Sequence, residues 1–381
     1  MKPPPAINLQ LMLGAMIPAA APAYITEKLE RIEITRTMDG ASAFQLHFHA
    51  DRTQGYAADY QLVDSPLLQP WNRVVVCVTL NGQTVTLIDG FITHQELAHD
   101  KQFAASTLSV TGEDVSILMD RLQVSIEYPM MGDSIIALVV LAKYSAIGII
   151  PEVIPTMADL IPTIVERVPQ QNSTDRAYVR QLAEPYGYKF FVTPGPELFT
   201  NIAYWGPPSH VGTVKPALSM DVGPATNIEK INFQLDSLAP IQVFGMVQDS
   251  ITEDDLPLVT ALSTRLPALA TNPALNPVGL FQRRDLFTDP RYGYMQAYVD
   301  GQAITDLSTD DVVTVQGELE TVRYGAILEA PGLVDVRGAG QSYDGRYVVR
   351  EVNHIIQRGL YKQAFRLTRE GTGSTVIQVA T

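Results

Sequence analysis

The sequence predicts an α+β fold that is mainly β. Short segments in which apolar and polar residues alternate recur in the first 112 residues and again toward the C-terminus, and this is the period of a half-buried strand. Between them lie segments in which apolar residues recur at helical spacing after helix-capping side chains. Of the 381 residues, 46% are hydrophobic and 18% are charged, which is typical of a globular protein with a sizeable core.

Residues 1–112 are expected to form a small antiparallel barrel or sandwich. Asn81-Gly82 is a strong hairpin signal, because both residues tolerate positive φ. The N-terminal stretch resembles an export signal, but its apolar residues fall at every second position, so we expect a strand and a Pro/Ala-rich linker rather than a cleaved peptide. Strands are predicted over 7–13, 29–35, 43–49, 73–80, 84–91 and 106–110.

Residues 113–205 predict a compact α+β domain inserted after these strands. Ser134 is placed as a helix cap, Ser173-Thr174-Asp175 is expected to cap the next helix, and Gly187 is expected to end that helix with positive φ. Neither G-x-G-x-x-G nor G-x-x-x-x-G-K-[ST] occurs, which argues against a nucleotide binder. The predicted helices cover 113–121, 134–146 and 173–183, and the predicted strands cover 188–192 and 198–204.

The remaining residues predict a second β domain, formed by 206–250 and 291–381. A proline-rich insertion without a clean period, 251–290, interrupts it, and a loop of that length is usually a functional or interface element. The predicted strands of this domain cover 229–235, 240–247, 294–299, 312–315, 345–357 and 360–368.

The charge and the cysteine content exclude several classes of function. The chain has 27 Lys+Arg and 41 Asp+Glu, a net charge of −14, which argues against sequence-specific nucleic-acid binding and against docking on anionic lipid. The apolar run 135–150 is too short to span a bilayer, so no membrane anchoring is expected. Cys77 is the single cysteine, which excludes a disulfide framework within the chain; it lies in an apolar run and is expected to be buried.

No group of residues in the sequence makes a convincing catalytic or metal site. His47 and His49 share a strand face, but no third ligand stands at a recognisable spacing. Ser134 is better explained as a cap than as a nucleophile, and the acidic pairs at 254–255 and 310–311 lie in turn-like settings. We therefore predict no catalytic residue, no cofactor and no metal. Trp71 and Trp205 are the stacking candidates of a carbohydrate-binding module, although core or turn anchoring fits both better.

The C-terminal segment is the one basic part of this acidic chain. Between Arg337 and Glu370 lie seven bases and three acids, a net charge of +4, which leaves −18 for the remainder. One interpretation is a solvated strand face; the other is a docking surface for an acidic partner, because arginine favours interface contacts. The candidate docking residues are Arg346, Arg350, Arg358, Lys362, Arg366 and Arg369.

Four segments carry a resemblance to a known family. Residues 173–192, STDRAYVRQLAEPYGYKFFV, resemble a helix-and-strand segment of phage tail hub proteins, the late-control D / VgrG-like baseplate hubs of contractile tails. The closing strands over 347–369 resemble the ending of that family. Residues 89–92 and 108–114 fit the end of its first barrel. Each motif alone is weak, but their order along the chain agrees with the family over nearly its whole length.

The resemblance implies two tail-tube-like β-barrels with inserted α/β elements and no enzymatic activity. It further implies a homotrimeric ring that joins a hexameric tail tube protein to a trimeric spike. The spike is expected to be a separate protein, because the chain ends at Thr381 soon after the second barrel. Other baseplate or tape-measure proteins are further implied partners. The implied location is a virion tail baseplate, or an injection particle, assembled in the host cytoplasm. A cell-wall hydrolase component and a β-rich carbohydrate-binding module are the alternatives.

Overall fold

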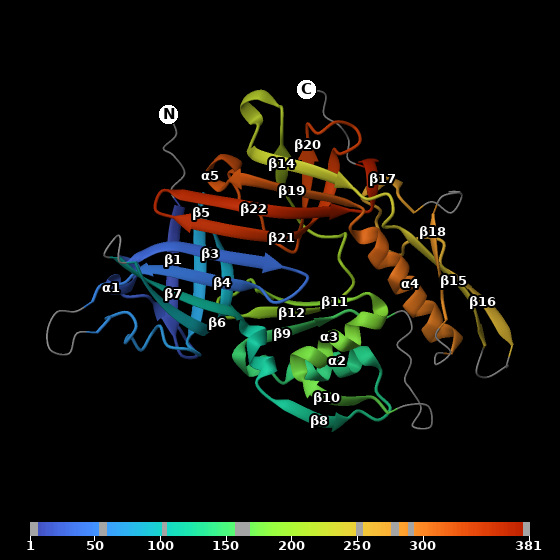
Figure 1. Cartoon of the computed structure of the whole chain (residues 1–381), viewed down its shortest axis with the longest axis horizontal. Helices are drawn as coiled ribbons and strands as arrows, with labels where there is room; N and C mark the ends of the chain where they lie inside the picture. The colour runs from blue at the N-terminus through green and yellow to red at the C-terminus, as the bar shows by residue number, and fades with distance from the viewer. Residues whose placement is uncertain are drawn as a thin grey trace.

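The computed structural model of the chain describes residues 7–52, 59–100, 105–156, 168–248, 254–275, 282–288 and 293–375. The predicted fold class is confirmed, since strands dominate and the longer helices lie beside one large sheet (Figure 1). Within these ranges no helix is both long enough and apolar enough to cross a membrane.

The first β half of the large sheet comes from the N-terminal residues. The predicted Asn81-Gly82 turn is confirmed, with φ values of 53° and 82° at its two residues. Cys77 is buried as predicted, and burial raises the pKa of its thiol. The elements are β1 (Ile7–Gly14), β2 (Ala19–Ala20), α1 (Ala23–Thr26), β3 (Leu29–Thr37), β4 (Ala43–His49), β5 (Arg73–Leu80), β6 (Gln83–Asp100) and β7 (Ala105–Asp114).

The middle unit combines short helices with small sheets. The cap predicted within 173–175 is confirmed, and the structure assigns it to Thr174, whose hydroxyl accepts a hydrogen bond from the Ala177 N–H at 3.3 Å. The helix predicted over 113–121 is instead a 3₁₀ helix, capped by the carboxylate of Asp114. The elements are η1 (Val115–Asp120), β8 (Gln123–Glu127), α2 (Asp133–Ala142), η2 (Ser145–Ile147), β9 (Ile149–Val153), β10 (Gln170–Thr174), α3 (Asp175–Ala183), η3 (Glu184–Tyr186), β11 (Lys189–Pro194) and β12 (Asn201–Gly206).

The second β half returns to the large sheet. A smaller unit branches from it, in which α4 packs on β15 and its neighbours around Val243, Leu258 and Ala297. The elements are β13 (Val214–Ser219), η4 (Gly223–Ala225), β14 (Ile228–Leu235), β15 (Ile241–Gln248), β16 (Asp255–Val259), β17 (Ala270–Pro273), β18 (Arg283–Leu286), α4 (Tyr294–Asp310), β19 (Val313–Glu320), α5 (Thr321–Tyr324), β20 (Gly332–Arg337), β21 (Gly345–Gln357), β22 (Leu360–Arg369) and β23 (Gly371–Ser374).

Two further predictions, one strand and one helix cap, are wrong. Residues 294–299 open helix α4 rather than a strand; its buried face repeats small residues, Ala297, Gly301 and Thr305, which give little hydrophobic signal. Ser134 does not cap α2, because the helix begins one residue earlier with Gly132 at its N-cap and no capping side-chain bond. Ser134 instead lies buried in the first helical turn.

The two β halves have the same strand order. Numbered by position along the chain, six described strands of each half are arranged 2-3-6-5-4-1 across the sheet. In the first half this order is β3-β4-β7-β6-β5-β1, and in the second it is β14-β19-β22-β21-β20-β13. The halves differ at the last pair, since β1 runs antiparallel to β5 whereas β13 runs parallel to β20. The fold therefore contains an internal duplication that is not visible as repeated sequence.

The two halves are joined edge to edge. Strand β21 of the second half pairs antiparallel with β3 of the first, with Glu351 opposite Thr37 and Gln357 opposite Arg31. One continuous sheet results, in which β14, β19, β22, β21, β3, β4, β7 and β6 follow one another from top to bottom in Figure 1. Each half curves around a hydrophobic core of its own, and a third core fills the middle unit around Trp205.

Candidate functional site

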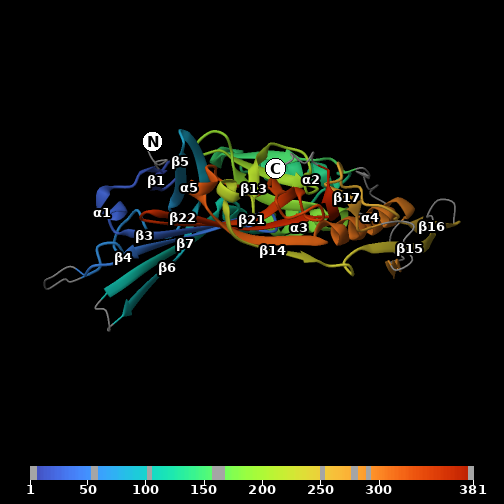
Figure 2. The ribbon, with the colours of Figure 1, turned by 90° about the horizontal axis from the view of Figure 1, so that it is seen from above.

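The side of the large sheet that points away from the two cores is polar, and we call it the polar face. Burial alternates along β4 and along most of β21 and β22, so the less buried side chains of these strands point to one side. Figure 2 shows these strands along one side of the molecule, with β13 and α2 on the other. The pairing register aligns the side chains in rows that cross both halves; one row is Lys230, Glu318, Ala364, Asn353, Thr35, Ala43 and Glu113.

Acidic side chains outnumber basic ones on the polar face. Several charges are paired across strands, for example Lys362 with Glu229, whose Nζ and Oε2 atoms are 2.6 Å apart. In the described strands the acids are Glu33, Glu96, Glu113, Glu229, Glu318, Glu320 and Glu351, and the bases are Arg31, Lys230, Lys362 and Arg366. This surface therefore disfavours the approach of a polyanion.

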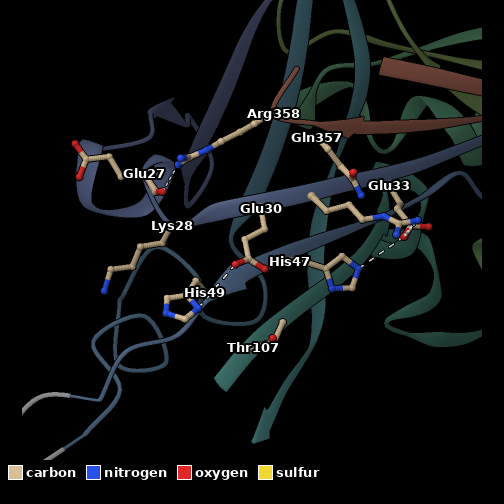
Figure 3. A pocket seen from close by; sticks show the side chains of 10 residues that line it. Glu27, Lys28, Glu30, Glu33, His47, His49, Thr107, Gln357 and Arg358 are labelled. Atoms are coloured by element: carbon tan, nitrogen blue, oxygen red, sulfur yellow. Dashed lines mark hydrogen bonds and ion pairs between the residues drawn. The ribbon is translucent and has the colours of Figure 1, made fainter. Parts of the chain in front are cut away.

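An open hollow of about 820 Å³ lies at one end of the polar face. Figure 3 shows its lining side chains reaching in from β3, β4, β7 and the end of β21. Cations and anions alternate around it, and Arg31 Nη2 lies 2.7 Å from Glu33 Oε1. The lining residues are all charged or polar, which fits a solvated surface better than an apolar ligand site. Its residues are Glu27, Lys28, Glu30, Arg31, Glu33, His47, His49, Thr107, Gln357 and Arg358.

His47 and His49 share one face of β4, as predicted, and both line this hollow (Figure 3). Each ring already has partners. His47 Nδ1 lies 3.0 Å from Ser109 Oγ, and His49 Nε2 lies 2.9 Å from Asp51 Oδ1. Among the residues that the structure describes, no three His, Cys, Asp or Glu side chains are grouped so that they could hold a metal ion.

Four of the six predicted docking residues are at least partly exposed. Arg358 is the most exposed of them and lies at the β21–β22 turn. All four have a partner in this chain: Arg346 Nε contacts Asp335 Oδ1 at 3.0 Å, Arg358 donates to the Glu27 carbonyl, Lys362 contacts Glu229, and Arg366 Nη2 contacts Asp39 Oδ2 at 2.8 Å. Their role in docking stays a prediction.

The other two predicted docking residues are buried, and the prediction is wrong for them. Arg350 is 4% exposed and its Nη2 lies 2.9 Å from the Asp311 carboxylate. Burial opposes its charged form, but the nearby carboxylates of Asp311 and Asp39 outweigh burial and raise its pKa. Arg369 is 1% exposed, donates to the carbonyls of Gly371 and Asp344 at 2.9 Å, and lies over the Tyr347 ring. Neither guanidinium can meet a partner.

The two tryptophans considered as carbohydrate-stacking candidates both contact other parts of this chain. Trp205 is fully buried, as the core alternative predicts, and its Nε1 donates to the Val179 carbonyl at 3.0 Å. Trp71 is 49% exposed in a turn with φ of 70°, and the Arg121 guanidinium lies 4.9 Å from its ring centroid. The Arg121 cation therefore already lies over this ring.

The turn-like settings predicted for the acidic pairs are confirmed for Asp311, which lies in a turn, but not for Asp310 or Asp255. Asp310 is the last residue of α4, is buried, and contacts Arg265 at 3.4 Å; burial raises the pKa of this carboxyl. Asp311 follows as the helix C-cap and pairs with Arg350. Asp255 is the first residue of strand β16.

The polar face itself was not predicted from the sequence. Its signal is present, because most of the odd-numbered residues of 29–37, 43–49 and 351–357 are polar or charged. The alternation identifies each strand, but it does not show that strands from distant parts of the chain align in one sheet. Only the β21–β3 pairing makes their outer sides a single surface.

Comparison with known proteins supports a tail-protein fold. No family model matches the sequence, and no curated protein matches it. A tail protein from Neisseria meningitidis MC58 aligns with a TM-score of 0.60 at 16% identity, covering 96% of this chain and 97% of that one. The 43 kDa tail protein of prophage MuSo2 from Shewanella oneidensis has a TM-score of 0.64 at 13% identity, covering 95% and 98%.

A chain in a VgrG complex has a similar fold. The Francisella PdpA–VgrG complex contains a chain that aligns with a TM-score of 0.57 at 9% identity, covering 98% of this chain and 60% of that one. These identities are low, so the likeness concerns the fold. The chain has the fold of phage tail proteins and of VgrG-like relatives over nearly its whole length.

Proposed function

We propose that the protein is a structural baseplate hub of a contractile phage tail or of a tail-like injection system. In this role three copies form a ring that joins a hexameric tail tube to a trimeric spike. The observation that carries the proposal is the internal duplication, in which two β halves of the same strand order are joined side by side in one sheet. The fold shared with tail proteins and the hub-like sequence motifs support it.

Internal duplication resolves a symmetry mismatch. A chain that contains two like halves presents two like docking sites, so three copies present six around a ring. A hexameric tube can then bind to six similar sites on one side, while a trimeric spike binds to three identical sites on the other. A chain with a single half would need six copies and would offer the spike six equal positions.

The polar face is the surface that we assign to the bore of the ring. It continues without interruption across both halves, as the wall of a channel requires. Its excess of glutamates would repel DNA phosphates, so that passing DNA does not adhere to the wall. The same surface would suit protein cargo in an injection particle, because it exposes few large apolar side chains.

The proposal assigns no catalysis to this chain. Its partners are the tail tube protein, a separate spike protein and other baseplate or tape-measure proteins, and its place is the tail baseplate. The partly exposed bases Arg346, Arg358, Lys362 and Arg366 are the candidate contacts for an acidic partner. Ion pairs within the chain satisfy Arg346, Lys362 and Arg366, and a hydrogen bond to the Glu27 carbonyl satisfies Arg358, so a partner would have to compete with these contacts.

The test is the mass and symmetry of the particle formed by the purified chain, alone and with its tube and spike proteins. We expect light scattering to give three times the chain mass of 41.8 kDa, and electron micrograph class averages to show a threefold ring with six similar lobes. A chain that stays monomeric with both partners contradicts the proposal. Hydrolysis of purified peptidoglycan by the chain would contradict the assignment as a non-enzyme.

A further inference from the structure

The small unit formed by β15, β16, β18 and α4, which we call the α4 unit, contains a three-stranded sheet. Its central strand β15 pairs antiparallel with β16 on one side and parallel with β18 on the other. Helix α4 covers the inner side of this sheet, where Val243, Val247 and Leu258 are buried. The unit lies at one end of the molecule, away from the first β half, in both Figure 1 and Figure 2.

The opposite side of this sheet, which we call the outer face, is apolar and exposed. Successive strand residues point to opposite sides, so Phe244 and Met246 point away from the side that α4 covers. Phe244 stands between Val259 of β16 and Leu286 of β18. The exposed fractions of Phe244, Met246, Val259 and Leu286 are 41%, 61%, 59% and 59%. A contiguous exposed apolar patch with polar residues at its rim is typical of an interaction site.

The strands of the α4 unit have the character of a sheet that is covered on both sides. From Val243 to Val247 no polar side chain interrupts β15, whereas a strand with one face in water alternates apolar and polar residues. The pairing of β15 with β18 is parallel, and parallel pairs occur mainly in sheets whose two faces are both covered. The outer face therefore has the composition of an interior surface, which a second layer would normally cover.

The outer face has the size of a helix rather than of a whole protein. Three strands about 4.8 Å apart, with about five residues each, cover roughly 250 Å². A stable contact between two folded proteins needs about 800 Å² on each side. An α-helix with its side chains is about 10 Å in diameter and rises about 1.5 Å per residue, so about eleven residues cover the face. The area therefore favours a single helix over a second copy of the chain as the occupant.

Opposite charges stand at the two ends of the outer face. Asp255 is opposite Gln248 at one end of β15, and Arg284 is opposite Gln242 at the other. Both charged residues are exposed and lie an even number of residues from the apolar positions of their strands, so they belong to the outer face. The N-terminus of an α-helix carries a partial positive charge and its C-terminus a partial negative charge. A helix along β15 is therefore favoured with its N-terminus at Asp255 and its C-terminus at Arg284.

We propose that the outer face binds an amphipathic α-helix of about three turns, contributed by another protein of the tail particle. The apolar side of this helix covers Phe244, Met246, Val259 and Leu286, and its N-terminus faces Asp255. The α4 unit then has three layers, with the sheet between the bound helix and α4. The proposal goes beyond the hub function and rests on it in one respect, because the occupant belongs to the particle in which the hub would stand.

Photo-cross-linking in the assembled particle identifies the occupant. A benzophenone residue in place of Met246 should link, in purified tail particles, to one segment of another particle protein whose apolar residues recur at helical spacing. The matched control has the benzophenone residue in place of Met295, which is 51% exposed on α4, on the other side of the sheet. This control should not link to that segment. Links from position 246 to a second copy of this chain overturn the proposal.

The two charged ends of the outer face test the orientation of the helix. A benzophenone residue in place of Asp255 should link to the N-terminal half of the same segment. A benzophenone residue in place of Arg284 should link to its C-terminal half. The reverse order overturns the orientation and, with it, the argument from charge.

Thiol accessibility supplies a measurement that does not depend on the identity of the occupant. Met246→Cys should react with a maleimide in the isolated chain and at least tenfold more slowly in the particle. Met295→Cys should react at similar rates in both, and the parent protein, with buried Cys77, gives the background. Equal rates for Met246→Cys in the chain and in the particle show that the outer face stays uncovered and overturn the proposal.

Binding of the linked segment as a synthetic peptide tests the contribution of the apolar patch. Met246→Lys in the full chain should weaken the binding of this peptide at least tenfold, by fluorescence anisotropy, because it places a charge in the middle of the apolar contact. Met295→Lys should leave the affinity unchanged, and circular dichroism checks that both variants are folded. Equal affinities of the two variants overturn the assignment of the outer face as the binding surface.

The docking proposal and the hub proposal fail in different ways. A threefold ring in class averages whose residue 246 reacts as fast in the particle as in the isolated chain refutes the docked helix and leaves the hub function standing. A helix linked at residue 246 in particles without a threefold ring of this chain supports the docking and refutes the hub. Absence of the chain from purified tail particles refutes both.

Discussion

The guanidinium of Arg73 and the carboxylate of Asp89 form a buried, bidentate ion pair, with Nε–Oδ1 and Nη2–Oδ2 distances of 2.6 Å. The side chains are 3% and 1% exposed. The pair also reaches the middle unit, since Asn201 Nδ2 donates to Asp89 Oδ2 at 2.9 Å and Arg73 Nη2 donates to the Phe199 carbonyl at 3.1 Å. It therefore fastens the middle unit to strands β5 and β6.

Asp89→Asn should be strongly destabilising. The substitution keeps the shape of the side chain but leaves the Arg73 cation buried without a counter-charge, which typically lowers the free energy of unfolding by about 3–5 kcal/mol. Urea unfolding followed by circular dichroism measures this. Asp285→Asn is the control, because Asp285 pairs with Arg283 on the surface and its loss should change stability by less than about 1 kcal/mol. Equal effects of the two variants would show that the buried pair contributes little.

Gly187→Val should destabilise the middle unit. Gly187 has a φ of 60°, as the sequence predicts, and an added Cβ would lie 3.3 Å from Ala303 Cβ and from Arg265 Nη2. The left-handed backbone alone disfavours a β-branched residue by about 1–2 kcal/mol, and crowding adds to this. Thermal unfolding should show a clear fall in Tm. Gly40→Val is the control, because an added Cβ at Gly40 would meet open space, and this variant should melt close to the parent protein. A similar fall in the Tm of Gly40→Val would contradict a specific role for Gly187.

His354 should make stability depend on pH. It is fully buried at the β21–β3 joint, where its Nδ1 lies 2.8 Å from Tyr361 Oη, and burial next to Arg36 lowers its pKa to about 3. The unfolded chain, with an ordinary histidine pKa near 6.5, binds the proton more readily than the folded one. Stability is therefore lost as pH falls from about 6.5 toward 3, by about 2 kcal/mol at pH 5 from this residue.

Comparison with His354→Gln isolates that contribution. The variant cannot take up the proton, so the slope of its unfolding free energy between pH 7 and pH 5 should be smaller than that of the parent protein. His94→Gln, at an exposed position on β6, should retain the parent slope. Parallel pH profiles for the parent protein and His354→Gln would show that the buried imidazole does not control acid stability.

Local patterns in the sequence predict much of this fold. The strands 43–49, 73–80 and 345–357 have the bounds expected from their alternation and turn residues. These signals are reliable because they depend only on neighbouring residues. Helix α4 was not predicted, because its buried face consists of small and polar residues, which do not produce a helical period of hydrophobic residues. The strand over 255–259 was not predicted either, because it contains a proline.

The candidate surfaces depend on contacts that are distant in sequence. The basic C-terminal segment is visible as composition, yet Arg350 is paired with the carboxylates of Asp39 and Asp311. Arg369 donates hydrogen bonds to backbone carbonyls of a folded turn. No local pattern distinguishes these two buried arginines from the exposed Arg358. Burial of a charge is decided by which partners the rest of the chain brings to it.

The sequence by itself determined the mainly β class, the principal turns and caps, and the acidic character of the protein, because these properties follow from local spacing and from counting charges. The tertiary structure alone decided that the two halves share one strand order, that β21 joins β3, and that the polar sides of both halves form one face. Backbone hydrogen bonds between strands carry no side-chain code, so duplication can persist in topology after it has disappeared from the residues.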